Sequence, residues 1–245
     1  MGFVAGTLVH TDKGLVPIEQ LKVGDRVLSK PESGEGELAY KLVVKTFKSK
    51  EKQKIIYINY QIFDDDNDEE LGERFLFCTE EHPFHVKNYW EGLDLGWLPA
   101  VDLSGSNHGI ETVEHNKLAI VMPPCDDYYD KTLGQSAKGE IARMLGYGDA
   151  ACALIDFRGK MPRVITRDNS HLLEKDSIYQ HEAILDLTNV SNSDIELLKI
   201  YELVEEVIDL GMPYKSYCYS LEVTDYHTYF VGKCGILVAA QKQTT

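Results

Sequence analysis

Segments that alternate apolar and polar residues and end in turns stand near both ends of the chain, and this pattern constrains the fold most. Residues 4–10 (VAGTLVH) and 53–63 (QKIIYINYQIF) are rich in β-branched and aromatic residues. Turn-forming residues occur at 11–14 (TDKG) and 23–25 (VGD). Three further segments alternate like half-buried strands: residues 73–79, 217–223 and 226–231. We therefore predict a mostly β fold built from both ends of the chain.

The middle of the chain follows a different pattern. Residues 136–148 (SAKGEIARMLGYG) place Ile141, Met144 and Leu145 at helical spacing, and residues 193–196 (SDIE) resemble a capping box. That box would open a helix that ends before Gly211, although residues 204–211 (VEEVIDLG) are equally consistent with a strand. We expect a core of residues 2–106 and 199–241, interrupted by a mixed α/β insertion at 107–198.

Composition excludes several function classes. The chain has 245 residues, 43% of them apolar, which suffices for a large hydrophobic core. Its formal net charge of −15 would repel a phosphate backbone, and the basic residues form no stripe, so we expect no nucleic-acid partner. No apolar run is long enough to span a membrane, and no export signal precedes Phe3. We expect a soluble monomer that does not bind a membrane.

Metal and cofactor sites are not expected either. The five cysteines are odd in number and widely spaced, without a CxxC pair, which is typical of buried free thiols. The acidic run at 64–70 (DDDNDEE) resembles the start of a calcium loop, but Glu69 stands where such a loop needs glycine, so a solvated hairpin tip is favoured. Trp90 and Trp97 are interpreted as aromatic residues at the edge of the β core.

Two short segments carry groups suited to peptide-bond chemistry. In CTEEHPFHV, Thr79 and His82 lie three residues apart at a strand end, and Pro83 makes the chain turn directly after the histidine. A hydroxyl and an imidazole held there could grip a peptide bond, although a TxxH pair alone is weak. In LEVTDYHTYFV, Asp225 and His227 precede a strand near the C-terminus. A lone histidine there is more often a hydrogen-bonded core residue than a catalyst.

Together and in this order, the three segments resemble the Hint family. These segments are FVAGT followed by GLVPIEQLKVGD, then TEEHPF, and finally LEV with HTYFV near the end. The family contains inteins, hedgehog autoprocessing domains, bacterial intein-like domains and the Hint domains of polymorphic toxins; the last two are the most similar. The resemblance covers residues 2–106 and 200–241. It implies a horseshoe-shaped β fold in which both ends of the domain meet at one site.

The resemblance also implies a role for each site position. A nucleophilic cysteine would stand at the place of Gly2, and its thiol would attack the preceding carbonyl to form a thioester. Thr79 would position the scissile amide, and His82 would protonate the departing nitrogen. At the other end, Ala239 and Ala240 occupy the places of a penultimate histidine and a terminal asparagine. The asparagine would cyclise to a succinimide while His227 polarises its carbonyl.

This chain departs from the family pattern at the reacting positions. Gly2 has no thiol, Ala240 cannot cyclise, and Ala239 cannot transfer a proton. Ser220 stands where many splicing members carry an ionisable group, and Gln241, the first residue after the domain, is no nucleophile. Cleavage is therefore favoured over full splicing. Because the surrounding segments are intact, we interpret the chain as an inactivated precursor, with engineered substitutions and a flanking segment removed or never included.

Two alternatives remain open at this level. A Hint-like fold retained as a non-catalytic binding module would also lack the reacting atoms. Residues 144–159 (MLGYGDAACALIDFRG) faintly resemble an acidic motif of homing endonucleases, which large inteins carry as insertions, but the acidic composition argues against DNA binding. As a self-processing domain, the chain would have its own flanking polypeptides as partners, within a larger bacterial secreted or surface protein.

Overall fold

The fold consists of β-strands, as the sequence predicts. The computed structural model describes residues 1–64, 69–105, 107–113, 118–122, 131–135, 139–144, 154–165 and 211–241. Within these residues the regular elements are strands and two 3₁₀ helices, η1 (Ile18–Gln20) and η2 (Ala100–Asp102). Among the described ranges, no helix is long and apolar enough to cross a membrane.

The strands follow in chain order. The first twelve are β1 (Phe3–Val4), β2 (Leu8–Thr11), β3 (Gly14–Pro17), β4 (Arg26–Ser29), β5 (Ala39–Lys48), β6 (Gln53–Lys54), β7 (Ile56–Asp64), β8 (Glu69–Cys78), β9 (Pro83–Asn88), β10 (Asp94–Pro99), β11 (His108–Glu111) and β12 (Leu118–Val121). The remaining eight are β13 (Leu133–Gln135), β14 (Ile141–Met144), β15 (Leu154–Asp156), β16 (Arg163–Ile165), β17 (Lys215–Ser216), β18 (Cys218–Val223), β19 (Thr228–Val231) and β20 (Ile236–Ala239).

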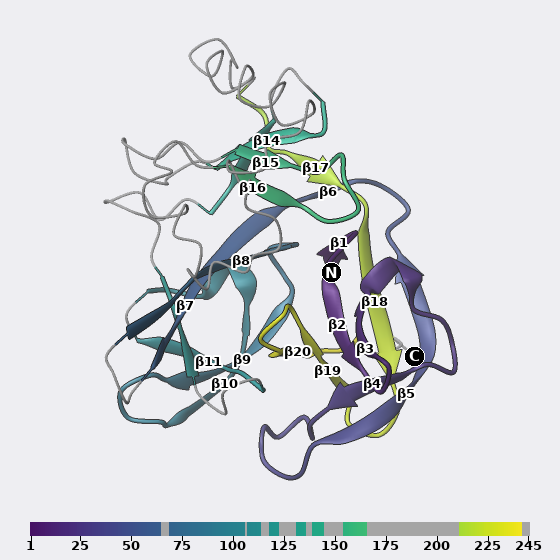
Figure 1. Cartoon of the computed structure of the whole chain (residues 1–245), viewed down its shortest axis with the longest axis vertical. Coiled ribbons are helices and arrows are strands. Elements are labelled where there is room, and N and C mark those ends of the chain that lie inside the picture. Colours follow the sequence, from purple (N-terminus) through teal and green to yellow (C-terminus); the bar gives the residue numbers. More distant parts are fainter. Residues whose placement is uncertain are drawn as a thin grey trace.

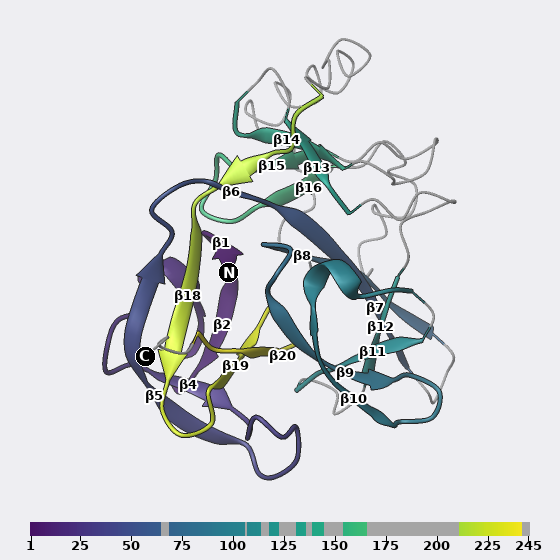
Figure 2. The same cartoon turned by 180° about the vertical axis from the view of Figure 1, so that it is seen from behind.

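One large antiparallel sheet contains most of these strands (Figure 1). Its order is β10-β9-β11-β12-β7-β8-β1-β18-β5-β4-β2-β19-β20, with β3 beside β2. The sheet bends round until β20 pairs with β9, where Val238 lies opposite Phe84. Strands from the two ends of the chain therefore lie side by side in it: β18 lies between β1 and β5, as the view from behind also shows (Figure 2).

The core of this sheet is apolar. Phe3, Tyr60, Phe84 and Tyr229 are among its largest fully buried side chains, and they come from β1, β7, β9 and β19. At about 1.5–3 kcal/mol for each large buried side chain, this packing is a main source of the free energy that holds distant segments together. It offsets the entropy of closing the long loops between the two ends.

A second, four-stranded sheet has the order β13-β14-β15-β16. Its apolar face carries Leu133, Ala142 and Ile155, and it packs on side chains of the large sheet's strands. Val4 of β1, Phe77 of β8 and Cys218 of β18 belong to this second cluster of buried residues. The small sheet therefore covers the strands at which the chain begins.

The helical interpretation of residues 141–145 is wrong for its described part. Ile141–Met144 form β14, which pairs with β13 and β15 and buries Ile141, Ala142 and Met144. Apolar residues three apart fit a helix and a half-covered strand equally well over so short a window. Tertiary pairing decides for the strand. The helix expected after residue 193 lies outside the described residues.

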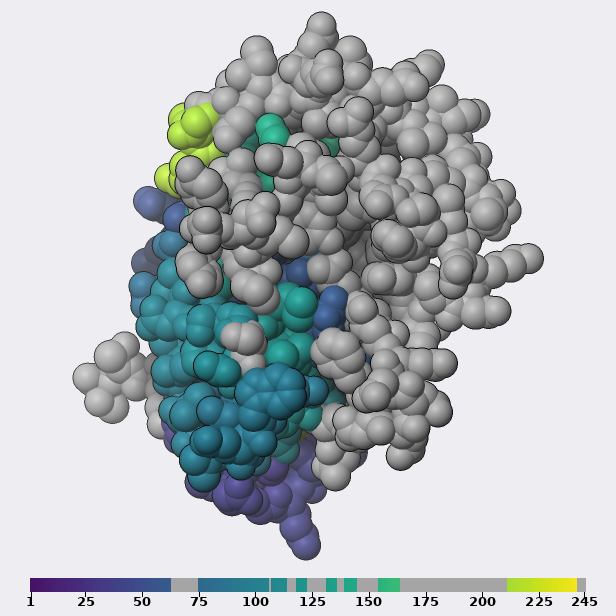
Figure 3. Space-filling view, turned by 90° about the vertical axis from the view of Figure 1, so that its left-hand side faces the viewer, coloured from purple at the N-terminus to yellow at the C-terminus, as the bar shows by residue number. Residues whose placement is uncertain are grey.

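The described part of the insertion is more β-rich than expected. Strands β11 and β12, which follow the boundary placed at residue 106, still belong to the large sheet through β9 and β7. Figure 3 shows one face of the molecule, on which teal residues of the β9–β12 region lie above purple residues of the N-terminal part. The acidic run at 64–70 joins β7 to β8, and Asp64 pairs with Glu69 across the hairpin.

Candidate functional site

Strand β18 receives both ends of the domain along one edge. Phe3 pairs with Tyr219, and continuing this antiparallel register by one residue places Gly2 opposite Ser220. The amide of Gln241 donates to the carbonyl oxygen of Leu221 at 2.8 Å. Gly2 and Gln241 thus lie along the same stretch of β18, beside the neighbouring residues Ser220 and Leu221.

Thr79 holds Gly2 through two reciprocal hydrogen bonds. The Gly2 amide donates to the Thr79 hydroxyl at 3.1 Å, and the Thr79 amide donates to the Gly2 carbonyl at 3.0 Å. Both form because β1 pairs with the end of β8, where Phe3 lies opposite Cys78. Thr79 is buried. The sequence-predicted threonine therefore orients the nitrogen of residue 2.

Gly2 itself adopts a conformation that suits glycine. Its φ is +154°, which L side chains rarely adopt, and a Cβ built on this backbone would lie 2.4 Å from the Tyr219 carbonyl oxygen. No pattern in the sequence predicts this contact with Tyr219. A cysteine at this position requires the first residue of the domain to rotate away from β18.

His82 is buried directly beside the start of the chain. Its ring makes an edge contact with Phe3 at a centroid distance of 4.3 Å and a second with Phe84 at 5.9 Å. Neither ring nitrogen has a hydrogen-bond partner among the described residues. Burial, assisted by the nearby positive N-terminus, lowers the pKa of His82 to about 3. The imidazole is therefore neutral at physiological pH and can accept a proton before it donates one.

A tight turn connects Thr79 to His82 and fixes both. The His82 amide donates to the Thr79 carbonyl at 3.1 Å, and Pro83 then begins β9. Helix η2 supports this turn, because the Val101 and Ala100 amides donate to the carbonyls of Glu80 and His82. The turn therefore brings both side chains of the TxxH pattern to the start of the chain, where Thr79 contacts Gly2 and His82 contacts Phe3.

His227 and Ala240 meet at the C-terminal end. The Ala240 amide donates to the His227 carbonyl at 2.7 Å, and Nδ1 of His227 is buried without a partner among the described residues. His227 has a φ of +53°, a strained value for a residue with a side chain. Ala239 lies opposite Thr228 in the β19–β20 hairpin. Ala239 and Ala240 therefore both lie close to His227 in the folded chain.

Hydrogen bonds from β4 anchor the loop that carries His227. Ser29 donates to the Thr228 carbonyl at 2.8 Å and lies 2.9 Å from the Thr228 hydroxyl. That hydroxyl also donates to the Lys30 carbonyl and accepts from the Lys30 amide. The backbone next to His227 is thus fixed from a strand near the opposite end of the chain.

Ser220 and Tyr229 place two hydroxyls in the interior between the ends. Both side chains are buried, and their hydroxyls lie close to each other. Burial raises the pKa of Tyr229, and the nearby Ser220 hydroxyl opposes this shift. Tyr229 was not singled out from the sequence, since it appears there as one aromatic residue of a strand.

Asp225 does not belong to this cluster. Its carboxylate is 67% exposed and forms a 3.0 Å ion pair with Lys41. Its φ of +59° is a value that aspartate tolerates in turns. Asp225 therefore shapes the β18–β19 turn, and its closeness to His227 in sequence does not bring it to the site. The indole of Trp97 donates to the Glu32 carbonyl, and Trp90 is exposed.

The described residues hold no cluster of three or more His, Cys, Asp or Glu side chains that suits a metal ion. Cys78, Cys218 and Cys234 are free and buried, and Cys125 and Cys152 lie outside the described residues. Burial raises the pKa of Cys78 well above its usual value, so it remains a protonated thiol.

Comparison with known proteins agrees with the resemblance read from the sequence. Residues 8–119 match the family model of the pretoxin Hint domain. No curated protein sequence is significantly similar to this chain. Among solved structures, a bacterial intein-like domain from Clostridium thermocellum is 17% identical, with a TM-score of 0.46 and 97% of each chain covered. A DnaB intein from Synechocystis is 12% identical, with a TM-score of 0.44 and coverage of 99% of this chain and 100% of that one.

Proposed function

We propose that this Hint-type chain is a self-processing domain, which cleaves the polypeptide bonds at its own two ends, and that the present sequence is an inactive form of it. The observation that carries the proposal is the meeting of Gly2 and Gln241 on β18, with Thr79 bonded to Gly2. A domain that acts on flanking polypeptides needs both junctions beside one set of polar groups. The partners are its own flanking segments, and no nucleic acid or metal takes part.

The N-terminal step needs a thiol at residue 2. The cysteine Sγ attacks the carbonyl carbon of the preceding residue, a C–S bond forms and the C–N bond breaks, which leaves a thioester and a free amine. The thiol proton passes to the leaving nitrogen. His82, whose ring contacts Phe3 beside this junction, relays that proton as a neutral imidazole, accepting at one ring nitrogen as the other donates. Thr79 accepts the hydrogen bond of that nitrogen and fixes its orientation.

The C-terminal step needs an asparagine at residue 240. Its side-chain nitrogen attacks its own carbonyl carbon, the bond to the Gln241 nitrogen breaks, and the proton passes to that nitrogen. The Gln241 amide already donates to Leu221, and the residue 240 amide is held by the His227 carbonyl. Holding attacking and leaving groups in place replaces an entropy cost that a free peptide would incur. Since Gln241 offers no nucleophile, cleavage is favoured over ligation.

Restoring the reacting groups tests this function. The triple variant Gly2→Cys, Ala239→His, Ala240→Asn is placed between two reporter proteins and incubated with and without a thiol. We expect fragments on a denaturing gel whose masses correspond to scission before residue 2 and after residue 240. Adding Thr79→Val or His82→Leu should abolish only the N-terminal product. A folded triple variant that stays intact would contradict the proposal.

A second function is favoured by the backbone at Gly2. The φ of +154° and the close approach of the Tyr219 carbonyl suit a glycine at this position, as expected for a non-catalytic binding module. The single variant Gly2→Cys separates the two. The module predicts loss of stability and no thioester, whereas the self-processing domain predicts that hydroxylamine or a thiol releases the upstream reporter.

A further inference from the structure

Lys131 is a buried lysine whose amine points at a helix end. Its Nζ donates to the carbonyl oxygens of Ala100 at 2.9 Å and Val101 at 3.1 Å, and also to that of Leu103. These are the carbonyls of η2 and of the residue that follows it. The Ala100 carbonyl also accepts from the Leu103 amide, and each carbonyl oxygen has two lone pairs, so the lysine supplies donors that this short helix leaves room for.

The position of Lys131 is itself fixed by the core. Its carbonyl accepts from the Tyr57 amide at 3.0 Å, and the next residue, Thr132, bridges to Ile56. Burial lowers the pKa of Lys131 to about 8, and the nearby carboxylate of Asp102 opposes this shift. A buried amine is costly to hold, and here three carbonyl acceptors compensate that cost.

Helix η2 in turn holds the turn that carries Thr79 and His82. Its Ala100 amide donates to the His82 carbonyl at 2.9 Å, and its Val101 amide donates to the Glu80 carbonyl at 3.0 Å. The three contacts form a continuous series from Lys131 to η2, then to the turn, and finally to Gly2 through the Thr79 hydroxyl. Each link in this series is a hydrogen bond, and the bonds from Lys131 to Ala100 and from Gly2 to Thr79 join buried groups.

We infer that Lys131 is a positioning residue for the N-terminal reaction, since it fixes through η2 the turn on which Thr79 and His82 stand. The inference rests on the proposed function for its chemical meaning, although the structural coupling does not depend on it. Lys131 touches neither reacting atom. It comes from outside the segment that matches the family model, so the region after residue 119 contributes a group to the site.

The coupling is tested first in the chain as it exists. In Lys131→Met, whose side chain keeps the apolar stem and loses the three donors, hydrogen exchange should be at least tenfold faster at the amides of Thr79, His82, Ala100 and Val101. Exchange at Leu154 and Ile155 of the small sheet should change less than twofold. Lys131→Arg should preserve most of the protection, since it retains the charge and the donors. The matched control is Lys87→Met, which removes a half-buried lysine that lies near Glu35 and Glu111.

Unchanged exchange around the turn in Lys131→Met would overturn the inference. Equal acceleration at every amide would also overturn it, because Lys131 would then serve only global stability. If Lys131→Met does not fold, Lys131→Gln keeps an amide donor and carries the same comparison.

The chemical role is tested in the restored triple variant. Adding Lys131→Met should slow N-terminal cleavage at least tenfold and change C-terminal cleavage less than twofold, with recovery in Lys131→Arg. A purely structural role would slow both steps together, and that result would refute the positioning role. If the triple variant never cleaves, the proposed function fails alone, because the exchange experiment still decides whether Lys131 orders the turn.

Discussion

Tyr219 and Leu221, two residues apart on β18, hold opposite ends of the domain. Tyr219 pairs with Phe3 of β1, and the Leu221 carbonyl accepts from the Gln241 amide. Residues two apart on a strand are separated by roughly 7 Å. The beginning and the end of the domain are therefore within the reach of one set of side chains, and Ser220 stands between them.

Loss of the Thr79 hydroxyl should destabilise the start of the chain. In Thr79→Val the buried Gly2 amide loses its acceptor, and leaving a buried donor unpaired costs about 1–3 kcal/mol. Chemical denaturation measures the loss. Thr79→Ser keeps the hydroxyl and should lose about 1 kcal/mol or less, for the removed methyl group. Equal losses in the two variants would show that the hydroxyl contact contributes nothing.

His82 should make the fold sensitive to acid. The pKa of His82 is about 3 in the folded chain, against an ordinary value of 6.5. Between these two pH values the unfolded chain binds a proton at His82 that the folded chain does not bind. The contribution of His82 is fully present above pH 6.5 and is lost as the pH falls toward 3. We expect about 1.4 kcal/mol lost for each pH unit below 6.

His82→Leu should flatten this dependence. Burial also lowers the pKa of His85 and His108, so both variant and parent retain some acid sensitivity. The difference between their free energies of unfolding, measured from pH 4 to pH 7, isolates His82. A difference independent of pH would mean that the imidazole reaches water in the folded state.

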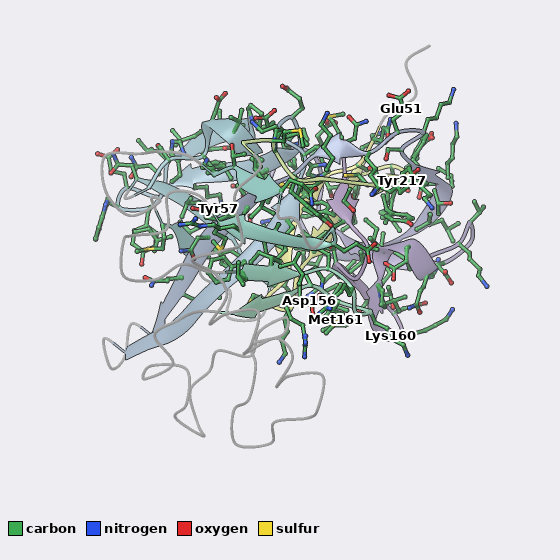
Figure 4. The ribbon with its side chains drawn as sticks, turned by 90° about the horizontal axis from the view of Figure 1, so that it is seen from above. Glu51, Tyr57, Asp156, Lys160, Met161 and Tyr217 are labelled. Atoms are coloured by element: carbon green, nitrogen blue, oxygen red, sulfur yellow. The ribbon has the colours of Figure 1, made fainter. Side chains whose placement is uncertain are left out.

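Gly6 should tolerate no side chain, because the small sheet docks on it. A Cβ there would lie 2.4 Å from the Lys160 carbonyl oxygen and 2.7 Å from the Met161 Cα. Figure 4 shows Lys160 and Met161 at the turn after Asp156, beside the N-terminal strands. Gly6→Ala should therefore be destabilised both by its φ of +84° and by this overlap.

Gly14→Ala is the matched control for that variant. Gly14 has a φ of +98° and nothing within 4 Å of a built Cβ, so alanine there should cost about 1–2 kcal/mol from backbone strain alone. Gly6→Ala should exceed this loss by at least about 1 kcal/mol in thermal or chemical unfolding. Equal losses would show that the contact with the small sheet is loose.

Asp225 should be dispensable for processing. Asp225→Asn keeps a residue that accepts positive φ and removes only an exposed ion pair with Lys41, worth about 0–1 kcal/mol. In the restored triple variant, cleavage rates at both junctions should stay within twofold of the parent rates. A loss of more than tenfold in the cleavage rate at either junction would show that Asp225 takes part in the reaction.

The local features of the site follow from the sequence. Pro83 after His82 forces the turn that TxxH needs, and the β-branched and aromatic residues around His227 favour a strand directly after it. These signals depend only on residues that are neighbours in the chain, so they can be recognised from the sequence. The strand at residues 141–144 could not be predicted from the sequence. Three apolar residues fit both the helical and the strand periodicity unless the strands that pair on either side are known.

What the sequence by itself determined is the β character of both ends of the chain and the order of the polar groups: Thr79 and His82 after one strand, and His227 before another. Only the tertiary structure decided that Gly2 and Gln241 meet at Ser220, that Asp225 faces Lys41 instead, and that Lys131 supports the turn from a distant segment. The physical reason is that strand register and buried hydrogen bonds join residues far apart in the chain. Such contacts are determined by the free energy of the whole packed core, which no local sequence pattern encodes.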